Sequence, residues 1–314
     1  MTRWLQRIDR LQQRYPPLAL LISVFKRFGE HKGAHLGTTI AYWSFFSIFP
    51  LMLAFVTILD IVLRNNPGTR QDVVESALGQ IPVLGSSLRQ EGLTGSWVAL
   101  TAGVATAIWT GMAAGSALQD SLDQVWDVPI RDRPNTVVKR LRVLGFLVLV
   151  AVGITVSTLA LNVTEFLDVG PFVGVAGYVL TFAVNTAIVL ATCWLLTSGD
   201  RDLKVHVPGA VVIGVVLTVL QSVGGAIARN YIAGASDTYG TFAVVIALLS
   251  YFFLISRVFL LGSELNAVLA HGLSPRSLLT DTPLTDGDRR ASEHDADRIQ
   301  RDPRLDVHID TAVT

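Results

Sequence analysis

Residues 205–228 read VHVPGAVVIGVVLTVLQSVGGAIA, a stretch without Asp, Glu, Lys or Arg. Roughly 20 apolar residues in a helix cross a bilayer core of about 30 Å, so this stretch is long enough to span a membrane. A helix is expected because hydrocarbon offers no partner to an unpaired backbone N–H or C=O. The residues also lack the alternation of a membrane β-strand. The stretch therefore predicts a transmembrane helix.

Comparable stretches occur elsewhere in the chain. Uncharged runs cover 38–59, 92–119, 143–164 and 169–199, and a last apolar run ends near residue 270. We therefore predict an all-α, polytopic membrane protein with six transmembrane helices, at 38–62, 96–118, 142–164, 171–197, 206–228 and 242–269. The composition of the 314 residues agrees, since 51% are hydrophobic and 16% are charged, whereas an ordinary soluble domain has about 25% charged residues.

The basic residues are distributed unequally between the loops. Most fall in the N-terminal segment, the 131–142 loop, the 201–204 loop and the tail, which lie on one side of the predicted bundle. The smaller group, on the other side, consists of Arg64, Arg70, Arg89 and Arg229. Since cytoplasmic loops carry the excess of Lys and Arg, we expect both termini in the cytoplasm. A net charge of zero gives no support to nucleic-acid binding.

Three regions follow from this pattern. Residues 1–37 form a cytoplasmic segment with amphipathic helices expected at 2–15 and 17–29. Residues 38–270 form the transmembrane domain, whose long outer loop covers 64–95. Residues 271–314 are polar, without Phe, Trp or Tyr, so a disordered cytoplasmic tail is expected.

The N-terminal helices have basic residues beside apolar faces, which is typical of helices that lie on an anionic membrane surface. A simple topology signal is the alternative. On the first interpretation the partners are anionic lipids, contacted by Arg3, Arg7, Arg10, Arg14, Lys26 and Arg27.

Two features predict packing inside the bundle. Small residues recur at every fourth position of the 96–118 span, which lets another helix approach closely. The residues expected at this contact are Gly103, Ala107, Gly111 and Gly115. Asn185 and Gln221 lie in adjacent spans, and we expect hydrogen bonds between their helices.

The last span contains two ionisable residues, Arg257 and Glu264. The free energy of inserting an Arg side chain at the membrane centre is unfavourable by at least about 2.5–3.5 kcal/mol on insertion scales. The two share a helix face but lie about 10 Å apart along the axis, so each needs another partner or water. Two interpretations of Arg257 and Glu264 are open. In one they line a path for a substrate or ion, and in the other they form structural polar contacts with neighbouring helices.

Enzyme motifs are missing. The sequence has no H-E-x-x-H, Walker A or G-x-S-x-G pattern, so we expect no catalytic residue, metal site or cofactor. His31 and His35 share a helical spacing but lack an evident third ligand. Asp120, Asp123 and Asp127 recur on one helix face, and a solvated acidic surface meeting the basic 131–142 segment is favoured over a cation site.

Three motifs between about residues 25 and 270 resemble the YihY/BrkB family. AYWSFFSIFPL at 41–51 resembles the family's A-Y-x-x-x-x-S-x-x-P pattern, TYGTFAVVIALL at 238–249 its Y-G motif, and LLGSELNA at 260–267 its L-G-A-E-L-N motif. Arg257 departs from the family pattern. The resemblance implies a six-helix protein of the bacterial inner membrane, and members carry a ribonuclease label or are linked to virulence or envelope lipid transport.

From the motifs and the charges we select candidates for a substrate path: Tyr42, Ser47, Pro50, Tyr239, Arg257, Glu264 and Asn266. Pro50 is also expected to kink its helix. We expect a transporter or flippase for an amphipathic or anionic envelope molecule such as a lipid. A noncatalytic membrane scaffold or regulator is the alternative, and a membrane enzyme ranks third, since the cytoplasmic loops are too short for an RNA surface with an acid–base pair. A homo-oligomer is compatible with the sequence.

Overall fold

The computed structural model describes residues 9, 11–62, 97–166, 170–199, 201–227, 241–279 and 284–299. Within these ranges the regular secondary structure is helical, and no strand occurs. The predictions for the outer loop 64–95, for Tyr239 and for Arg3, Arg7 and Arg10 fall outside these residues.

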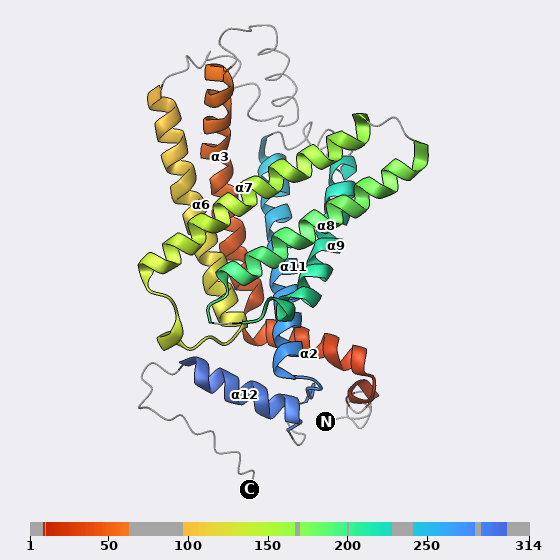
Figure 1. Ribbon diagram of the computed structural model, residues 1–314. Coiled ribbons are helices and arrows are strands. Elements are labelled where there is room, and N and C mark those ends of the chain that lie inside the picture. Colours follow the sequence, from red (N-terminus) through yellow and green to blue (C-terminus); the bar gives the residue numbers. More distant parts are fainter. Residues whose placement is uncertain are drawn as a thin grey trace. The chain divides into compact units, whose positions relative to one another are not determined.

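Each predicted span falls on one long helix (Figure 1). These helices are α3 (Gly33–Val62), α6 (Trp97–Val125), α7 (Thr136–Phe166), α8 (Gly170–Leu196), α9 (Val207–Ile227) and α11 (Thr241–His271). Among the described residues, three segments are long and apolar enough to cross a membrane: Gly177–Leu196, Leu203–Gln221 and Val245–His271. A helical membrane protein is thereby supported, while six crossings and cytoplasmic termini stay predictions.

The shorter elements are helix α2 (Pro16–Glu30), the 3₁₀ turns η1 (Ile130–Asp132) and η2 (Leu203–His206), and helix α12 (Asp286–Ile299). The chain divides into two compact units. The first unit comprises Met1–Gly37, Ser116–Gln221 and Ile255–Thr314, and the second comprises Thr38–Gly115 and Ser222–Leu254. We describe each unit by itself.

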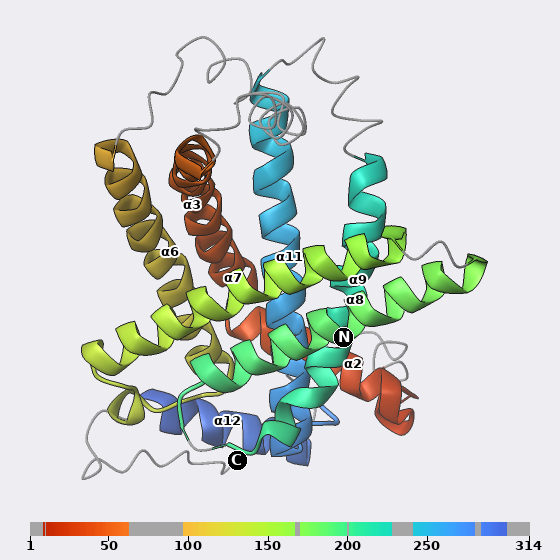
Figure 2. The same ribbon diagram turned by 45° about the horizontal axis from the view of Figure 1, so that its top comes forward.

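In the second unit, the parts of α3 and α6 run side by side in both ribbon views (Figures 1 and 2). The stripe of small residues on α6 is buried, whereas Val104 and Ile108 beside it are exposed. The stripe therefore occupies the covered face of α6, as close helix packing requires. It consists of Gly103, Ala107, Gly111 and Gly115.

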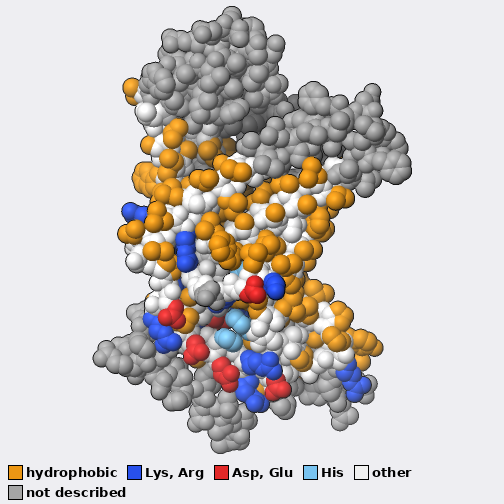
Figure 3. Space-filling model, in the orientation of Figure 1, with side chains coloured by type: hydrophobic (Ala, Val, Ile, Leu, Met, Phe, Trp, Pro, Cys, Tyr) orange, Lys and Arg blue, Asp and Glu red, His pale blue; other side chains and the backbone are white. Residues whose placement is uncertain are grey.

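In the first unit, α7 and α8 lie alongside each other and present a largely hydrophobic surface (Figure 3). Charged side chains gather at the end of the unit that carries α12. Helices α8 and α9 are joined by the amide of Asn185, whose Nδ2 donates to Thr218 Oγ1 and to Gln221 Oε1, both at 3.0 Å. The predicted hydrogen bonds between these helices are confirmed.

Helices α9 and α11 approach each other through glycine. Gly209 N donates to Asn266 Oδ1 at 2.7 Å, and Asn266 Nδ2 donates to the His206 carbonyl at 3.1 Å. A Cβ on Gly209 would overlap the Gly262 carbonyl oxygen and lie 2.6 Å from Asn266 Nδ2. The contact therefore requires a residue without a side chain at position 209.

Replacing Gly209 by alanine is expected to destabilise the fold by about 1–3 kcal/mol, because the added methyl forces α9 and α11 apart. Unfolding in detergent, followed by circular dichroism, measures the change. Gly29→Ala is the matched control, since nothing lies within 4 Å of a Cβ there and alanine favours a helix. Equal stability of the two variants would contradict the close approach.

Helix α2 exposes three large apolar side chains. Leu18, Leu21 and Phe25 are 45–60% exposed, while the opposite side buries a narrow stripe of small and polar residues. Pro16 begins the helix, at a position where the missing N–H removes no hydrogen bond. An exposed apolar face suits a helix that lies on a membrane surface.

The tail departs from its prediction. Residues 286–299, expected to be disordered, form helix α12. Ala291 of α12 packs in a core cluster with Val24, Val268 and Leu273. Asp288 is 3% exposed, and its carboxylate accepts hydrogen bonds from Lys26 Nζ at 2.9 Å and Arg276 Nε at 3.0 Å. A polar segment is thus ordered through charge pairing rather than through a large apolar face.

The start of α12 has a recognisable signal. Thr285 Oγ1 accepts from the backbone N–H of Asp288 at 3.1 Å, and the Asp288 carboxylate also accepts from Ser277 N at 2.9 Å. Thr285 N donates in turn to the Asp288 carboxylate at 3.3 Å, so these two residues form the capping pattern Thr-x-x-Asp. Burial alone would raise the pKa of Asp288, but the hydrogen bonds from Ser277, Lys26, Thr285 and Arg276 hold it below its usual value.

Asp288→Asn is expected to loosen α12, because an amide loses charge-assisted hydrogen bonds worth about 1.5–3 kcal/mol. Hydrogen exchange over residues 284–299 should accelerate at least about tenfold. Asp286→Asn serves as the control, since the Asp286 side chain is 77% exposed. Unchanged exchange in Asp288→Asn would show that the carboxylate does not anchor the helix.

Candidate functional site

Arg27 of α2 and the residue that caps this helix, His31, are buried in the first unit. Arg27 is 2% exposed and His31, which caps the helix, is 4% exposed. Lys32 follows with φ 54°, so the chain turns there and begins α3 at Gly33. Gln124 Nε2 donates to the His31 carbonyl at 2.8 Å and ties this turn to α6. The end of α2 is thereby fixed against the end of α6.

Asp127 lies just beyond α6 in the left-handed region, with φ 49°, a conformation that Asp tolerates better than most residues. Its Oδ2 accepts from Arg27 Nη2 at 2.9 Å, and its Oδ1 lies 3.2 Å from His31 Nε2. Arg27 Nη2 also donates to the Val125 carbonyl at 2.7 Å. The turn therefore aims the carboxylate back at α2.

Glu264 of α11 completes the group. It is fully buried, and its Oε2 accepts from Arg27 Nε at 3.1 Å while its Oε1 lies 2.6 Å from His31 Nδ1. We call Arg27, His31, Asp127 and Glu264 the buried charge network. It joins the end of α2, the end of α6 and the last third of α11 within one compact unit.

The network is balanced when His31 is protonated. Ionised carboxylates only accept hydrogen bonds, so an imidazole that faces two of them must donate from both ring nitrogens. Burial alone would lower the pKa of His31, but its hydrogen bonds to Asp127 and Glu264 raise it to about 9. Two cations then face two anions.

Asp127 and Arg27 are held in their charged forms. Burial alone would raise the pKa of Asp127, but the hydrogen bond to His31 and the charge of Arg27 lower it. Burial alone would lower the pKa of Arg27, yet the charges of Glu264 and Asp127 raise it. The network is therefore a set of mutually stabilised ions.

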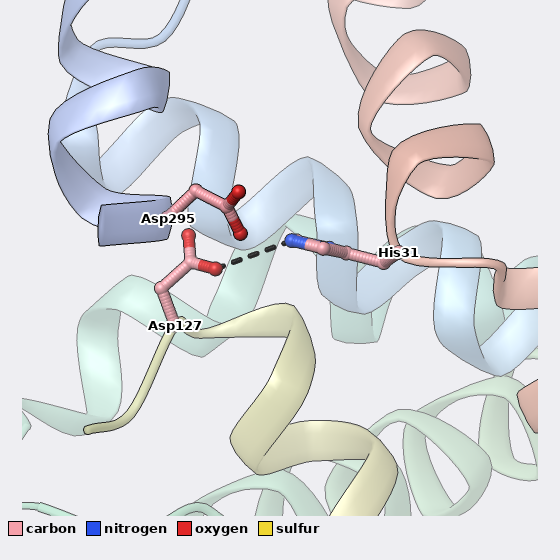
Figure 4. A group of neighbouring side chains, drawn as sticks. All are labelled: His31, Asp127 and Asp295. Atoms are coloured by element: carbon pink, nitrogen blue, oxygen red, sulfur yellow. Dashed lines mark hydrogen bonds and ion pairs between the residues drawn. The ribbon is translucent and has the colours of Figure 1, made fainter. Parts of the chain in front are cut away.

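The geometry also brings His31, Asp127 and Asp295 of α12 together (Figure 4), with one ligand atom of each within 4.8 Å of the others. However, Arg298 Nη2 donates to Asp295 at 2.6 Å, and its Nε lies 3.8 Å from Asp127. An imidazolium that donates from both nitrogens has no lone pair for a metal. We therefore assign these side chains to ion pairing with arginine.

The predicted path residues have separate surroundings. In the first unit, Glu264 belongs to the charge network, Asn266 bonds to α9, and the Cγ of Arg257 lies 3.4 Å from where a Cβ of Gly37 would be. In the second unit, Tyr42 is half exposed and packs on Phe46, with ring centroids 4.7 Å apart. Ser47 donates to the Ser44 carbonyl at 2.7 Å, and Pro50 lies inside α3.

Some expectations for charged residues differ from the structure. Asp120 pairs with Lys139 at 2.5 Å, so the expected contact with the basic segment is confirmed there. Asp123 and Asp127, expected on a solvated surface, are 2% and 5% exposed. Burial raises the pKa of Asp123, whose Oδ1 accepts from Ser198 N at 3.0 Å.

Two basic residues expected to contact lipid are instead engaged inside the protein. Arg27 belongs to the charge network, and Lys26 donates to the Ser277 carbonyl at 2.7 Å and to Asp288. Arg14 is exposed. Contact of anionic lipids with the N-terminal segment stays a prediction.

Apolar helices long enough for a bilayer, together with ionisable residues buried among them, define an integral membrane protein of the helical class. Residues 24–281 match the model of the family described as virulence factor BrkB, and the chain belongs to that family. The resemblance seen in the sequence motifs is confirmed. No solved structure matches the chain.

Relatives of the chain carry different descriptions. The inner membrane protein YhjD of Escherichia coli (strain K12) is 24% identical over 293 residues, which cover 84% of this chain and 85% of YhjD. The putative ribonuclease-like protein YfkH of Bacillus subtilis (strain 168) is 26% identical over 283 residues, covering 80% of this chain and 95% of YfkH. An uncharacterized protein of Dickeya dadantii (strain 3937), Dda3937_02003, is 29% identical over 140 residues, or 40% of each chain.

Proposed function

We propose that this chain is a transporter or flippase for an amphipathic, anionic envelope molecule such as a lipid. The observation that carries the proposal is the buried charge network, which joins α2, the end of α6 and α11. We further propose that the chain lies in a bacterial plasma membrane with both termini in the cytoplasm, because the basic residues gather on the side of the termini.

Buried ion pairs are a poor way to gain stability. Hydrophobic residues of similar volume are often as stabilising or more so, because ions lose their hydration on burial. Of the four network residues, Glu264 lies in a predicted membrane span, where an ionisable residue is expensive and commonly marks a substrate path or proton relay. A network that holds three helix segments by charge is therefore better explained as a closure that opens during transport.

The surface of the first unit supports an amphipathic cargo. The large apolar residues of α2 are exposed, which suits contact with acyl chains. Basic residues on the proposed cytoplasmic side suit an anionic headgroup. Within this proposal Arg257 and Tyr42 are candidates for contact with the cargo, whereas Glu264 and Asn266 hold helices together.

Reconstitution into vesicles tests the proposal. Fluorescent phosphatidylglycerol in the inner leaflet should become accessible to an external quencher faster with the chain than without it, and faster than fluorescent phosphatidylcholine. Arg257→Gln should slow the anionic lipid, while Arg140→Gln, at an exposed position, should not. Translocation no faster than in protein-free vesicles would refute transport and favour the scaffold. Cleavage of RNA by the purified chain would favour the enzyme.

A further inference from the structure

A second polar feature lies apart from the charge network, where α7 begins, α8 ends and η2 leads into α9. A cavity of about 220 Å³ is lined there by Arg142 of α7, by Arg201 and by His206. The wall is completed by Trp194, Leu195, Thr197 and Gly199. All of these residues belong to the first unit.

The guanidinium of Arg201 is held in place. Its Cζ lies 4.7 Å from the centroid of the buried Trp126 ring, and its Nη1 donates to the Ser198 carbonyl. Gly199 has φ +93°, and a Cβ there would lie 3.0 Å from Arg201 Nη1. The glycine thus permits both the turn and the close passage of the guanidinium. Arg201 is preoriented rather than free to reach into solvent.

Three buried polar atoms of the cavity wall have no hydrogen-bond partner among the described residues: Arg142 Nη1, Thr197 Oγ1 and His206 Nδ1. Thr197 and His206 are 3% and 1% exposed. A buried polar atom without a partner costs about 1–3 kcal/mol, so such atoms are rare in folded proteins. Each of these atoms can donate a hydrogen bond, which points to a ligand rich in acceptor oxygens.

The neighbouring acidic residues make their hydrogen bonds elsewhere, although the charges of Asp123 and Asp127 also act on Arg201. The Asp123 carboxylate accepts from Ser198 N, and Asp202 accepts from Lys204 N at 3.1 Å. Within the described ranges, which leave out Asp200, no ion pair joins Arg142 or Arg201 to a carboxylate. The two guanidiniums therefore give the cavity a positive character.

We propose that this cavity binds a phosphate oxyanion through Arg142, Arg201 and Thr197. Arginine is suited to this, since its planar fork matches two phosphate oxygens. The phosphate belongs to a lipid headgroup or to a free phosphate compound. Trp194 is 57% exposed at the same cavity, and tryptophan is typical of the level where lipid headgroups meet acyl chains.

This assignment rests on the proposed function only where the bound phosphate is taken to be part of the cargo. Binding and flux are separate measurements, so their failures are distinguishable. Binding without flux would leave the site in place and remove the transporter. Flux without binding at this cavity would leave the transporter in place and remove the phosphate site.

The test uses the full chain in detergent and in nanodiscs. Inorganic phosphate is titrated by calorimetry, and phosphatidylglycerol is compared with phosphatidylcholine by native mass spectrometry. Arg142→Gln should weaken binding at least tenfold, and Arg142→Lys should retain more of it. Arg140→Gln, on the same helix but exposed, should bind as the unmodified chain does. Thermal unfolding shows whether each variant is folded.

The outcomes separate the sources of the phosphate. Binding of phosphatidylglycerol but not of inorganic phosphate assigns the site to a lipid headgroup. Binding of inorganic phosphate assigns it to the free oxyanion, and binding of both probes assigns it to both. Binding of neither probe would overturn the proposal. Equal affinity of folded Arg142→Gln and Arg140→Gln would overturn it too. Arg201→Gln should also weaken binding. If this variant fails to fold because the contact with Trp126 is lost, the comparison of Arg142→Gln with Arg140→Gln decides.

Discussion

Replacing Arg27 by methionine is expected to lower the free energy of unfolding by about 3–5 kcal/mol, because it leaves buried carboxylates without their guanidinium. Arg27 donates to both Asp127 and Glu264, and all three side chains are at most 2% exposed. Methionine keeps much of the volume and the flexible stem. The loss therefore comes from uncompensated charge and not from a cavity.

Chemical unfolding in detergent, monitored by tryptophan fluorescence, measures this loss. Arg14→Met is the matched control, since Arg14 is an exposed arginine of the same N-terminal region. It should change stability by no more than about 0.5 kcal/mol. Should the two variants unfold at the same denaturant concentration, the ion pairs around Arg27 contribute nothing to the fold.

Raising the pH from 6.5 to 9 is expected to destabilise the fold by up to about 3 kcal/mol. The pKa of His31 is raised to about 9 in the folded chain from an ordinary value of 6.5, because the carboxylates of Asp127 and Glu264 stabilise its charged form. A raised pKa contributes stability that is fully present below pH 6.5. That stability is lost as the pH rises through the folded value.

Unfolding curves at pH 6.5, 7.5, 8.5 and 9 test this dependence. The charged groups that face His31 are Asp127, Glu264 and Arg27, with Asp295 and Arg298 of α12 nearby. His31→Gln should be less stable at pH 6.5 and should lack the decline toward pH 9. A decline of the same size in His31→Gln would assign the pH dependence to other groups.

Much of the fold follows from the positions of charges in the sequence. The runs without charge predict the long helices α3, α6, α7, α8 and α9, and an equally apolar run that contains Arg257 and Glu264 predicts α11. The cost of Glu264 in hydrocarbon predicts that it needs another partner or water, and Arg27 and His31 are the partners found. The Thr285-x-x-Asp288 capping pattern could have indicated α12.

The partner of Glu264 could not be predicted in the same way. Arg27 follows Lys26 in an amphipathic segment, a pattern that predicts contact with lipid headgroups, yet α2 buries the stripe Ala19, Ser23 and Arg27 and exposes Phe25. The spacing of Asp120, Asp123 and Asp127 predicts one shared helix face, but the helix ends at Val125 and φ 49° turns Asp127 inward. Contacts across more than 90 residues depend on tertiary packing that local patterns do not encode.

The transport account as a whole is tested most directly by the translocation rate of fluorescent phosphatidylglycerol in proteoliposomes between pH 6.5 and 9. If the charge network closes the cytoplasmic end, deprotonation of His31 weakens the closure. The rate should then rise across this interval in the unmodified chain and stay flat in His31→Gln. A rate that does not change with pH in the unmodified chain, or that changes equally in His31→Gln, would contradict the account.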